Sequence, residues 1–164
     1  MSSPAEEERI AARRLKRRQT PTAQLGPEHT AGCEVLPDRA ALMARLPQGG
    51  VGAEIGVAFG DYTDVILERN RPRTLHLVDA WDTDRYREGL AAIRARFATS
   101  IAGGAIAIHQ GYSTEVLSQF ADGMFDWIYL DTDHSYETTL AELRLAAPKL
   151  KAGGLLAGHD YSTG

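Results

Sequence analysis

The 164-residue sequence contains one cysteine, no long apolar run and little net charge. Because Cys33 is alone, the chain cannot form an internal disulfide or supply the several thiolates of a cysteine-rich zinc site. A single cysteine suits the reducing cytoplasm, which is the location we expect. No stretch of 18 apolar residues is present, so no membrane partner is expected, and the N-terminus lacks the apolar segment of a secretory signal.

The net charge of −4 gives the chain no overall attraction to nucleic acid or to anionic membranes. We therefore do not expect a nucleic acid partner. The apolar fraction of 43% and the chain length suit one globular domain with a sizeable core.

Residues 1–30 differ in composition from the rest of the chain. Three glutamates, Glu6 to Glu8, precede a basic run over residues 13–18, an order of charges that suits the dipole of a helix. The segment has few large apolar residues to bury. We expect a charged N-terminal arm, partly helical or disordered, followed by one domain over residues 31–164. A basic patch for RNA or phosphate is the alternative to a solvated helix face.

From residue 38 onward, short apolar runs alternate with stretches of helical periodicity. The expected strands are 51–57, 74–78, 105–109, 125–130 and 155–159. The expected helices are 38–46, 60–69, 84–99, 113–120 and 135–150, with Pro148 disturbing or shortening the last one. This alternation predicts an α/β fold, in which right-handed crossovers build a parallel sheet covered by helices on both faces.

A glycine-containing loop follows the first expected strand. Gly56 lets the backbone turn sharply and approach a ligand, and Gly60 lets the next helix begin close to the strand. The G-x-x-x-G spacing differs from the G-x-G-x-x-G of dinucleotide-binding proteins, which argues against a nicotinamide-dependent oxidoreductase. A plain strand-to-helix turn also uses glycines, so the loop alone leaves both interpretations open.

Asp79 ends the second expected strand, where a carboxylate can accept hydrogen bonds from both hydroxyls of a ribose. A helix-capping role is its alternative. Trp81 would flank an adenine or fill the core, and Ser113 would lie beside the adenine or cap a helix. Without a loop specific for pyrophosphate, these residues favour a nucleoside ligand such as S-adenosylmethionine, with Glu54 near its ammonium group.

Two acidic motifs follow the fourth and fifth expected strands. They are Asp131-Thr132-Asp133-His134-Ser135-Tyr136 and Gly158-His159-Asp160-Tyr161. Because parallel strands end at one edge of a sheet, the motifs meet where open α/β sheets bind ligands. Asp131 has helix capping as its alternative role, and His134 has a supporting or capping role. His76 and His109, inside strand patterns, are expected to be structural.

The ordered set of motifs resembles the class I S-adenosylmethionine-dependent methyltransferases. Its members are Glu54-Ile55-Gly56-Val57, Gly60, Leu77-Val78-Asp79, Leu130-Asp131-x-Asp133-His134-Ser135-Tyr136-Glu137, Gly153-Gly154 and the second acidic motif. They look closest to the macrocin O-methyltransferase-like branch, methyltransferase domain 24, over roughly residues 38–161. The resemblance implies a Rossmann-like, doubly wound sheet of strand order 3-2-1-4-5.

The resemblance also implies roles for individual residues. The cofactor S-adenosylmethionine would be held by Glu54, Gly56, Gly60, Asp79, Ala80, Trp81, Ser113 and Asp131. The implied metal ligands are Asp131, His159 and Asp160, and the implied catalytic residues are Asp133 and His134. Relatives can carry a carboxylate at position 159, so His159 makes Mn²⁺ or Fe²⁺ suitable as well as Mg²⁺. The expected reaction is metal-assisted methyl transfer to a hydroxyl of a small-molecule substrate.

The family's sheet normally continues past the fifth strand, whereas the sequence ends at Gly164. We expect a sheet that lacks strands six and seven and has the fifth strand as an exposed edge. Three explanations are open. They are truncation, which we favour; coverage of the edge by the arm or by a partner, for example in a homo-oligomer; and impaired catalysis. The alternative function is a truncated, non-catalytic nucleoside-binding domain.

Overall fold

The computed structural model describes residues 4–21 and 25–159. The described residues form two compact units, one ending at Val35 and the other beginning at Leu36. The first unit contains α1 (Pro4–Gln19) and α2 (Pro27–Thr30). α1 has Glu6 and Glu7 in its first turn, so its acidic end coincides with the positive end of the helix dipole.

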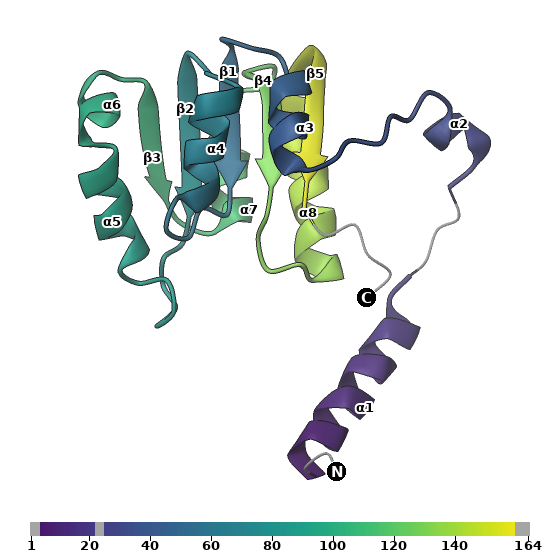
Figure 1. The fold of residues 1–164 in the computed structure, drawn as a ribbon. Coiled ribbons are helices and arrows are strands. Elements are labelled where there is room, and N and C mark those ends of the chain that lie inside the picture. Colours follow the sequence, from purple (N-terminus) through teal and green to yellow (C-terminus); the bar gives the residue numbers. More distant parts are fainter. Residues whose placement is uncertain (1–3, 22–24, 160–164) are drawn as a thin grey trace. The chain divides into compact units, whose positions relative to one another are not determined.

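The second unit alternates strands and helices along the chain (Figure 1). Its strands are β1 (Val51–Ile55), β2 (Thr74–Asp79), β3 (Ile106–Gln110), β4 (Phe125–Leu130) and β5 (Leu150–Gly158). Its helices are α3 (Arg39–Arg45), α4 (Asp61–Arg69), α5 (Gly89–Arg96), α6 (Ala98–Ala102), α7 (Ser113–Gln119) and α8 (Tyr136–Ala146), followed by the 3₁₀ turn η1 (Ala147–Lys149). None of the helices in the described parts of the chain combines the length and apolarity that crossing a bilayer requires.

The five strands form one parallel sheet of order β3-β2-β1-β4-β5, which confirms the predicted fold class and strand order. Helices cover both faces (Figure 1). On one face α3, α4 and α5 contribute Met43, Ile66 and Ile93 to a core with Trp127. On the other face α7 and α8 pack against the sheet, for example through Leu117. The strands are therefore buried on both sides, which is why they read as short apolar runs.

A buried asparagine fixes α3 against the sheet. The Asn70 amide donates to the carbonyls of Met43 and Leu46, at 3.0 and 3.2 Å, and its oxygen accepts from the Trp127 indole at 3.0 Å. Gly52 makes room for that indole, because an added Cβ would overlap it. This contact anchors the C-terminal end of α3 near the amino ends of β1 and β4. Arg39, the first residue of α3, reaches Asp131 at the opposite edge of the sheet, in the site described below.

The predicted helix over residues 84–99 is wrong at its start and is interrupted. The chain first makes a turn in which the Thr83 carbonyl accepts from the backbone N–H groups of Tyr86 and Arg87. α5 begins only at Gly89, where a Cβ would overlap the Ala58 carbonyl. The loop between Asp79 and Gly89 therefore stays close to the glycine loop after β1.

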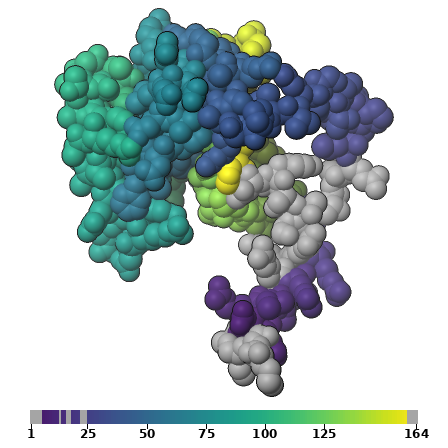
Figure 2. Space-filling view, viewed as in Figure 1, coloured from purple at the N-terminus to yellow at the C-terminus, as the bar shows by residue number. Residues whose placement is uncertain are grey.

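The end of α8 follows the prediction, whereas the start of β5 does not. α8 ends at Ala146 and tightens into a 3₁₀ turn containing Pro148, as the missing N–H of proline predicts. β5 begins at Leu150, five residues earlier than expected, and passes Gly153 at φ +78°. Within residues 36–159, β5 pairs with β4 alone, and Leu155 is 44% exposed. Figure 2 shows yellow atoms of β5 at the surface above and below the blue α3.

Candidate functional site

A cleft of about 950 Å³ lies where β1, β2 and β4 end. Nine of the predicted site residues line it: Glu54, Gly56, Asp79, Ala80, Trp81, Ser113, Asp131, Asp133 and His134. Gly60 and His159 lie beside the cleft without lining it. Gly60 precedes the first turn of α4 at φ +82°. Asp160 lies outside the described residues. The fold thus gathers at one edge side chains that are up to 80 positions apart in the sequence.

Asp79 holds the glycine loop in place. One oxygen of its carboxylate accepts from the backbone N–H groups of Val57 and Ala58, at 2.8 and 2.9 Å. The other accepts from the N–H of Trp81 at 2.9 Å. The helix-cap alternative is wrong, since the next helix begins at Gly89 without a side-chain cap. A carboxylate offers about four acceptor positions, so Asp79 keeps room for about one further hydrogen bond.

Trp81 belongs to the core and to the cleft at once. It is 3% exposed, packs in the cluster with Ile93, and donates its indole N–H to the Ala58 carbonyl at 2.8 Å. Its backbone is left-handed, with φ +48°. The two roles expected for Trp81 are therefore compatible, because a buried ring can also form one wall of the cleft.

Ser113 is the first residue of α7, and the helix-capping position is Tyr112, without a side-chain cap. The expected capping role of Ser113 is therefore wrong by one position. The Ser113 side chain instead contacts Glu142 of α8. Glu142 also accepts from the Thr132 hydroxyl at 3.0 Å, and burial raises its pKa although these contacts lower it. This buried carboxyl joins α8 to the residues that follow β3 and β4.

Glu54 is a buried acid at the bottom of the cleft. It is 1% exposed, and its carboxylate accepts from the Thr63 hydroxyl at 2.6 Å. Burial raises the pKa of Glu54 to about 8, although the Thr63 hydrogen bond works in the opposite direction. The negative charges of Asp131 and Asp79 add to the rise. A cation bound in the cleft would favour the ionised form of Glu54.

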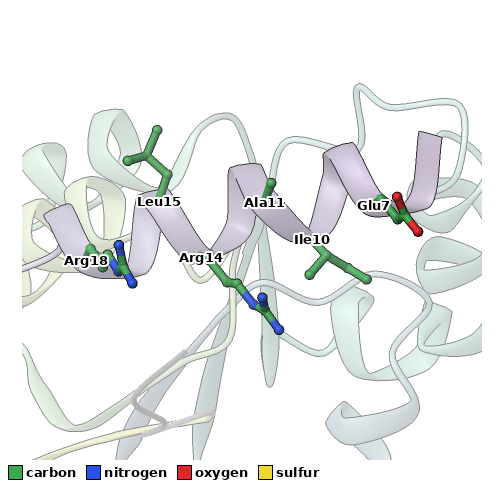
Figure 3. A pocket seen from close by; sticks show the side chains of 6 residues that line it. All are labelled: Glu7, Ile10, Ala11, Arg14, Leu15 and Arg18. Atoms are coloured by element: carbon green, nitrogen blue, oxygen red, sulfur yellow. The ribbon is translucent and has the colours of Figure 1, made fainter. Parts of the chain in front are cut away.

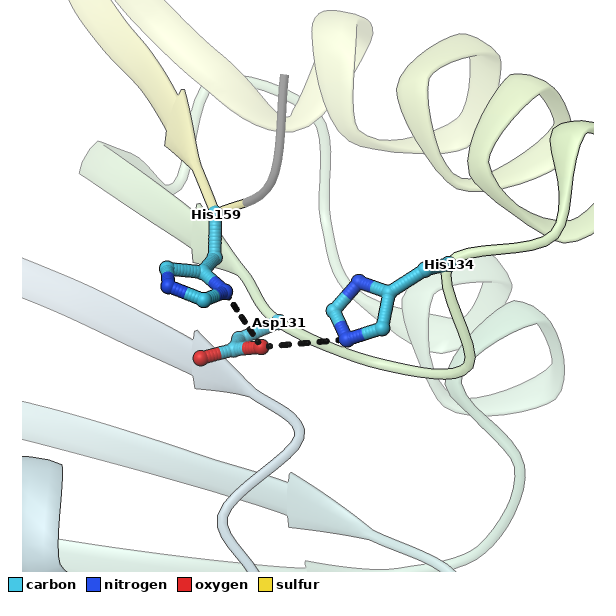
Figure 4. A group of neighbouring side chains, drawn as sticks. All are labelled: Asp131, His134 and His159. Atoms are coloured by element: carbon cyan, nitrogen blue, oxygen red, sulfur yellow. Dashed lines mark ion pairs between the residues drawn. The ribbon is translucent and has the colours of Figure 1, made fainter. Parts of the chain in front are cut away.

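Asp131, His134 and His159 converge after β4 and β5 (Figure 4). Oδ1 of Asp131 lies 3.6 Å from Nε2 of His134 and 3.5 Å from Nδ1 of His159. One possible ligand atom from each residue lies within 4.8 Å of the other two. The structure thus brings two of the predicted metal ligands together, and it adds His134, which the sequence had assigned to catalysis.

Asp133 is engaged at the start of α8. One of its oxygens accepts from the Ser135 N–H at 2.9 Å and the other from the Thr138 hydroxyl at 3.0 Å. Partial burial works to raise the pKa of Asp133, but these hydrogen bonds and nearby His134 lower it below its usual range. A carboxylate with a lowered pKa is a weaker base. The following residue, His134, has a left-handed backbone at φ +57°.

Sequence reasoning missed Arg39. Its guanidinium donates to Oδ2 of Asp131 at 3.2 Å and to the Tyr129 hydroxyl at 3.5 Å. It also lies 4.6 Å above the ring of Tyr62, whose hydroxyl donates to the Arg39 carbonyl. No local pattern marks this arginine, because it precedes Asp131 by 92 positions and meets it only through the packing of α3.

One protein family matches most of the second unit. Residues 53–161 match the model of a family described as Methyltransferase domain. A search of the curated proteins found no match.

Solved structures share the fold at low sequence identity. One is precorrin 8w decarboxylase from Methanobacterium thermoautotrophicum, with 17% identity and a TM-score of 0.54, covering 81% of this chain and 67% of that one. Another is an rRNA methylase from Streptococcus thermophilus, with 12% identity and a TM-score of 0.55, covering 85% and 75%. A third is SMU.1697c from Streptococcus mutans in complex with SAH, with 11% identity and a TM-score of 0.55, covering 73% and 68%.

These similarities establish the fold. The reaction has to be inferred from the residues of the site. The first three solved structures matched are spanned by this chain over 67%, 42% and 68% of their length. One of the structures described above is a decarboxylase and another a methylase, so one fold supports more than one reaction.

Proposed function

The chain belongs to the methyltransferase domain family, and from this premise we propose that it transfers a methyl group from S-adenosylmethionine to a hydroxyl of a small molecule, assisted by a divalent cation. The observation that carries the proposal is the composition of the cleft. A buried acid and a loop-bound carboxylate line one side, and Asp131 and the His134 imidazole line the other, with the His159 imidazole beside it.

The first side of the cleft suits the cofactor. Glu54 would face its ammonium group, and the remaining acceptor position of Asp79 would take one ribose hydroxyl. Gly56 at φ +91° lets the backbone approach, and the wall formed by Trp81 would contact the adenine or ribose. When bound, the cofactor would supply an electrophilic methyl group on its sulfonium.

The second side of the cleft suits a cation. The donor set of Asp131, His134 and His159 has one carboxylate and two imidazoles. Such a set fits Mn²⁺ or another transition metal better than Mg²⁺, which prefers an all-oxygen shell. When bound, the cation would polarise the hydroxyl that accepts the methyl group. Arg39 holds the second oxygen of Asp131 and so orients the first toward the imidazoles.

The acceptor hydroxyl must also lose a proton. We assign this task to the segment Asp133–His134, in which the hydrogen bonds of Asp133 to Ser135 and Thr138 fix the turn that presents His134. With a cation bound, His134 would be one of its ligands, and Asp133 would take the proton. Without a cation, the His134 imidazole, which lines the cleft beside Asp131, would take it.

A second candidate is a non-catalytic nucleoside-binding domain. It is favoured by the state of Asp133, whose two oxygens are already hydrogen-bonded and whose pKa is lowered, so that it is a weak base. Both candidates predict cofactor binding, and turnover separates them.

The test is calorimetric titration with S-adenosylhomocysteine, followed by methyl transfer from S-adenosylmethionine to a panel of hydroxyl-bearing small molecules. We expect binding, and transfer that chelation lowers and Mn²⁺ restores. No binding of S-adenosylhomocysteine contradicts both candidates. Binding without transfer to any acceptor supports the second.

The cation is tested separately by Mn²⁺ binding, followed by electron paramagnetic resonance. Asp131→Asn and His159→Gln are each expected to weaken binding about tenfold or more. Asp122→Asn is the control, because Asp122 pairs with Lys149 and does not line the cleft. Equal Mn²⁺ affinity in all variants would remove the cation from the proposal and leave Asp133 and His134 acting alone.

A further inference from the structure

The first unit carries a helix face that the proposed function does not use. Six residues of α1 line a shallow groove along one side of the helix: Glu7, Ile10, Ala11, Arg14, Leu15 and Arg18 (Figure 3). Their spacing of three and four residues places them on a single face. Ile10 is 43% and Leu15 is 58% exposed, and together they form the apolar centre of an otherwise charged face.

Charge is segregated along this face. Glu7 is at the N-terminal end, and Arg14 and Arg18 are at the C-terminal end. No ion pair joins these three residues to another side chain that the structure describes. A partner that offers the reverse order of charges would therefore complement the face.

A second copy of α1, running antiparallel, has that order. When the two helices are centred between positions 12 and 13, Glu7 of one copy lies level with Arg18 of the other. Ile10 lies level with Leu15, and Ala11 lies level with Arg14. The members of every pair are equally far from the centre, so all six residues obey one two-fold axis. Ala11 is small and leaves space for the stem of the facing arginine.

We propose that α1 is a self-association surface, on which two copies of the chain pair through antiparallel α1 helices. The interface is isologous, because each copy contributes the same six residues, and it forms two Glu7–Arg18 ion pairs. Parallel pairing would place Glu7 against Glu7, Arg14 against Arg14 and Arg18 against Arg18, without any ion pair, so charge repulsion disfavours it. Antiparallel pairing also brings the two Arg14 residues within about 4.5 Å along the axis, but it keeps both Glu7–Arg18 ion pairs. Exposed ion pairs are weak and the apolar area is small, so the dimer should be salt-sensitive.

Charge reversal tests the proposal on the full chain, with sedimentation equilibrium measured from low to high micromolar concentration. Glu7→Arg and Arg18→Glu are each expected to raise the dissociation constant about tenfold or more, because each turns two attractions into two repulsions. Mixing the two variants restores both ion pairs, so the mixture is expected to form a heterodimer at concentrations where each variant alone is largely monomeric.

Two further variants separate this surface from others. Arg9→Glu reverses a charge on the opposite side of α1 and is expected to leave the dimer as it was. Leu155→Lys alters the exposed edge strand β5 and is also expected to have no effect. Association that Leu155→Lys abolishes and Glu7→Arg spares would assign the dimer to the strand edge and overturn the proposal. A chain that stays monomeric and changes its sedimentation only with added polyphosphate would overturn it in favour of an anionic partner.

Discussion

At the scale of single residues, Glu54 has the most unusual environment in the cleft. It is almost wholly buried, its carboxylate accepts from the Thr63 hydroxyl, and the carboxylates of Asp131 and Asp79 raise its pKa further. Its ordinary pKa of 4.5 rises to about 8, so near neutral pH the folded protein largely keeps a proton that the unfolded chain has released. Such a group opposes folding at alkaline pH, where the buried carboxyl must ionise.

This proton gives the first prediction. Between pH 4.5 and 8 the folded state binds more protons than the unfolded state at Glu54, so stability falls as pH rises through this range. The full contribution is at most about 5 kcal/mol, since the pKa rises from 4.5 to about 8 and one pKa unit corresponds to about 1.4 kcal/mol. Glu54→Gln removes it, and the difference between the two proteins, measured by urea unfolding at a series of pH values, should shrink toward pH 5. If the unfolding free energies of the two proteins differ by the same amount at every pH, Glu54 does not carry the raised pKa.

At the scale of elements, the loop between β1 and α4 depends on Gly56. The residue adopts φ +91°, and an added Cβ would overlap the backbone oxygen of Asp131, where β4 ends. The glycine loop and the backbone of Asp131 are therefore so close that no side chain fits at position 56.

Gly56→Ala is accordingly expected to destabilise the protein by about 3 kcal/mol or more and to abolish binding of S-adenosylhomocysteine. Gly123→Ala is the matched control. Gly123 has φ +66° but nothing within 4 Å of an added Cβ, so it should cost about 1–2 kcal/mol and leave binding unchanged. Thermal unfolding and calorimetry measure both effects. Equal losses in the two variants would show that backbone conformation, and not the overlap with Asp131, is decisive.

The pairing of β2 with β3 contains a second titratable element. His76 and His109 lie with ring nitrogens 2.9 Å apart, and Phe120 and Phe125 meet the His76 ring edge-on. Burial lowers the pKa of His76 to about 4, and the neighbouring His109 adds to this. Burial also lowers the pKa of His109. The prediction that both histidines are structural agrees with this packing.

Acid should therefore destabilise this part of the sheet. Below about pH 6.5, His76 binds a proton in the unfolded chain but stays neutral in the folded protein. Stability therefore falls from pH 6.5 toward pH 4. His76→Phe is expected to reduce this fall by about 1–2 kcal/mol, allowing for partial exposure to solvent. Urea unfolding at each pH measures it. If the free energy of unfolding of the variant falls between pH 6.5 and 4 as much as that of the unmodified protein, the histidine pair does not contribute to acid destabilisation.

At the scale of the whole molecule, the residues that line the cleft all belong to the second unit, whereas α1 belongs to the first. Ligand binding and self-association are therefore expected to be separable. S-adenosylhomocysteine at a hundredfold excess over its dissociation constant should stabilise the second unit by about 2.7 kcal/mol.

Amide hydrogen exchange tests this separation residue by residue. With ligand bound, exchange is expected to slow over residues 54–60 and 79–81, which contain the glycine loop and Asp79, and to stay unchanged over Pro4–Gln19. Dilution below the concentration at which the dimer forms should speed exchange over Pro4–Gln19 and leave exchange over residues 54–60 and 79–81 unchanged. Protection of α1 by the ligand would contradict independence of the two units.

Much of the fold could be predicted because its signals are local. Apolar runs and helical spacing located the five strands, Asp38 and Ser135 marked helix starts that the structure confirms, and Pro148 marked the end of α8. The interrupted helix after Asp79 could not be predicted, because contacts of Gly89 with the glycine loop decide where α5 begins. Periodicity along the chain does not record such contacts.

The sequence by itself determined the parallel α/β fold, its strand order through the family resemblance, and the edge at which polar side chains gather. Only the tertiary structure decided what those side chains do to one another. It bound Asp79 to the glycine loop, joined His134 with His159 around Asp131, and brought Arg39 to the same carboxylate from α3. The physical reason is that residue spacing specifies local elements, whereas the meeting of distant charges depends on how the crossovers stack those elements on the sheet.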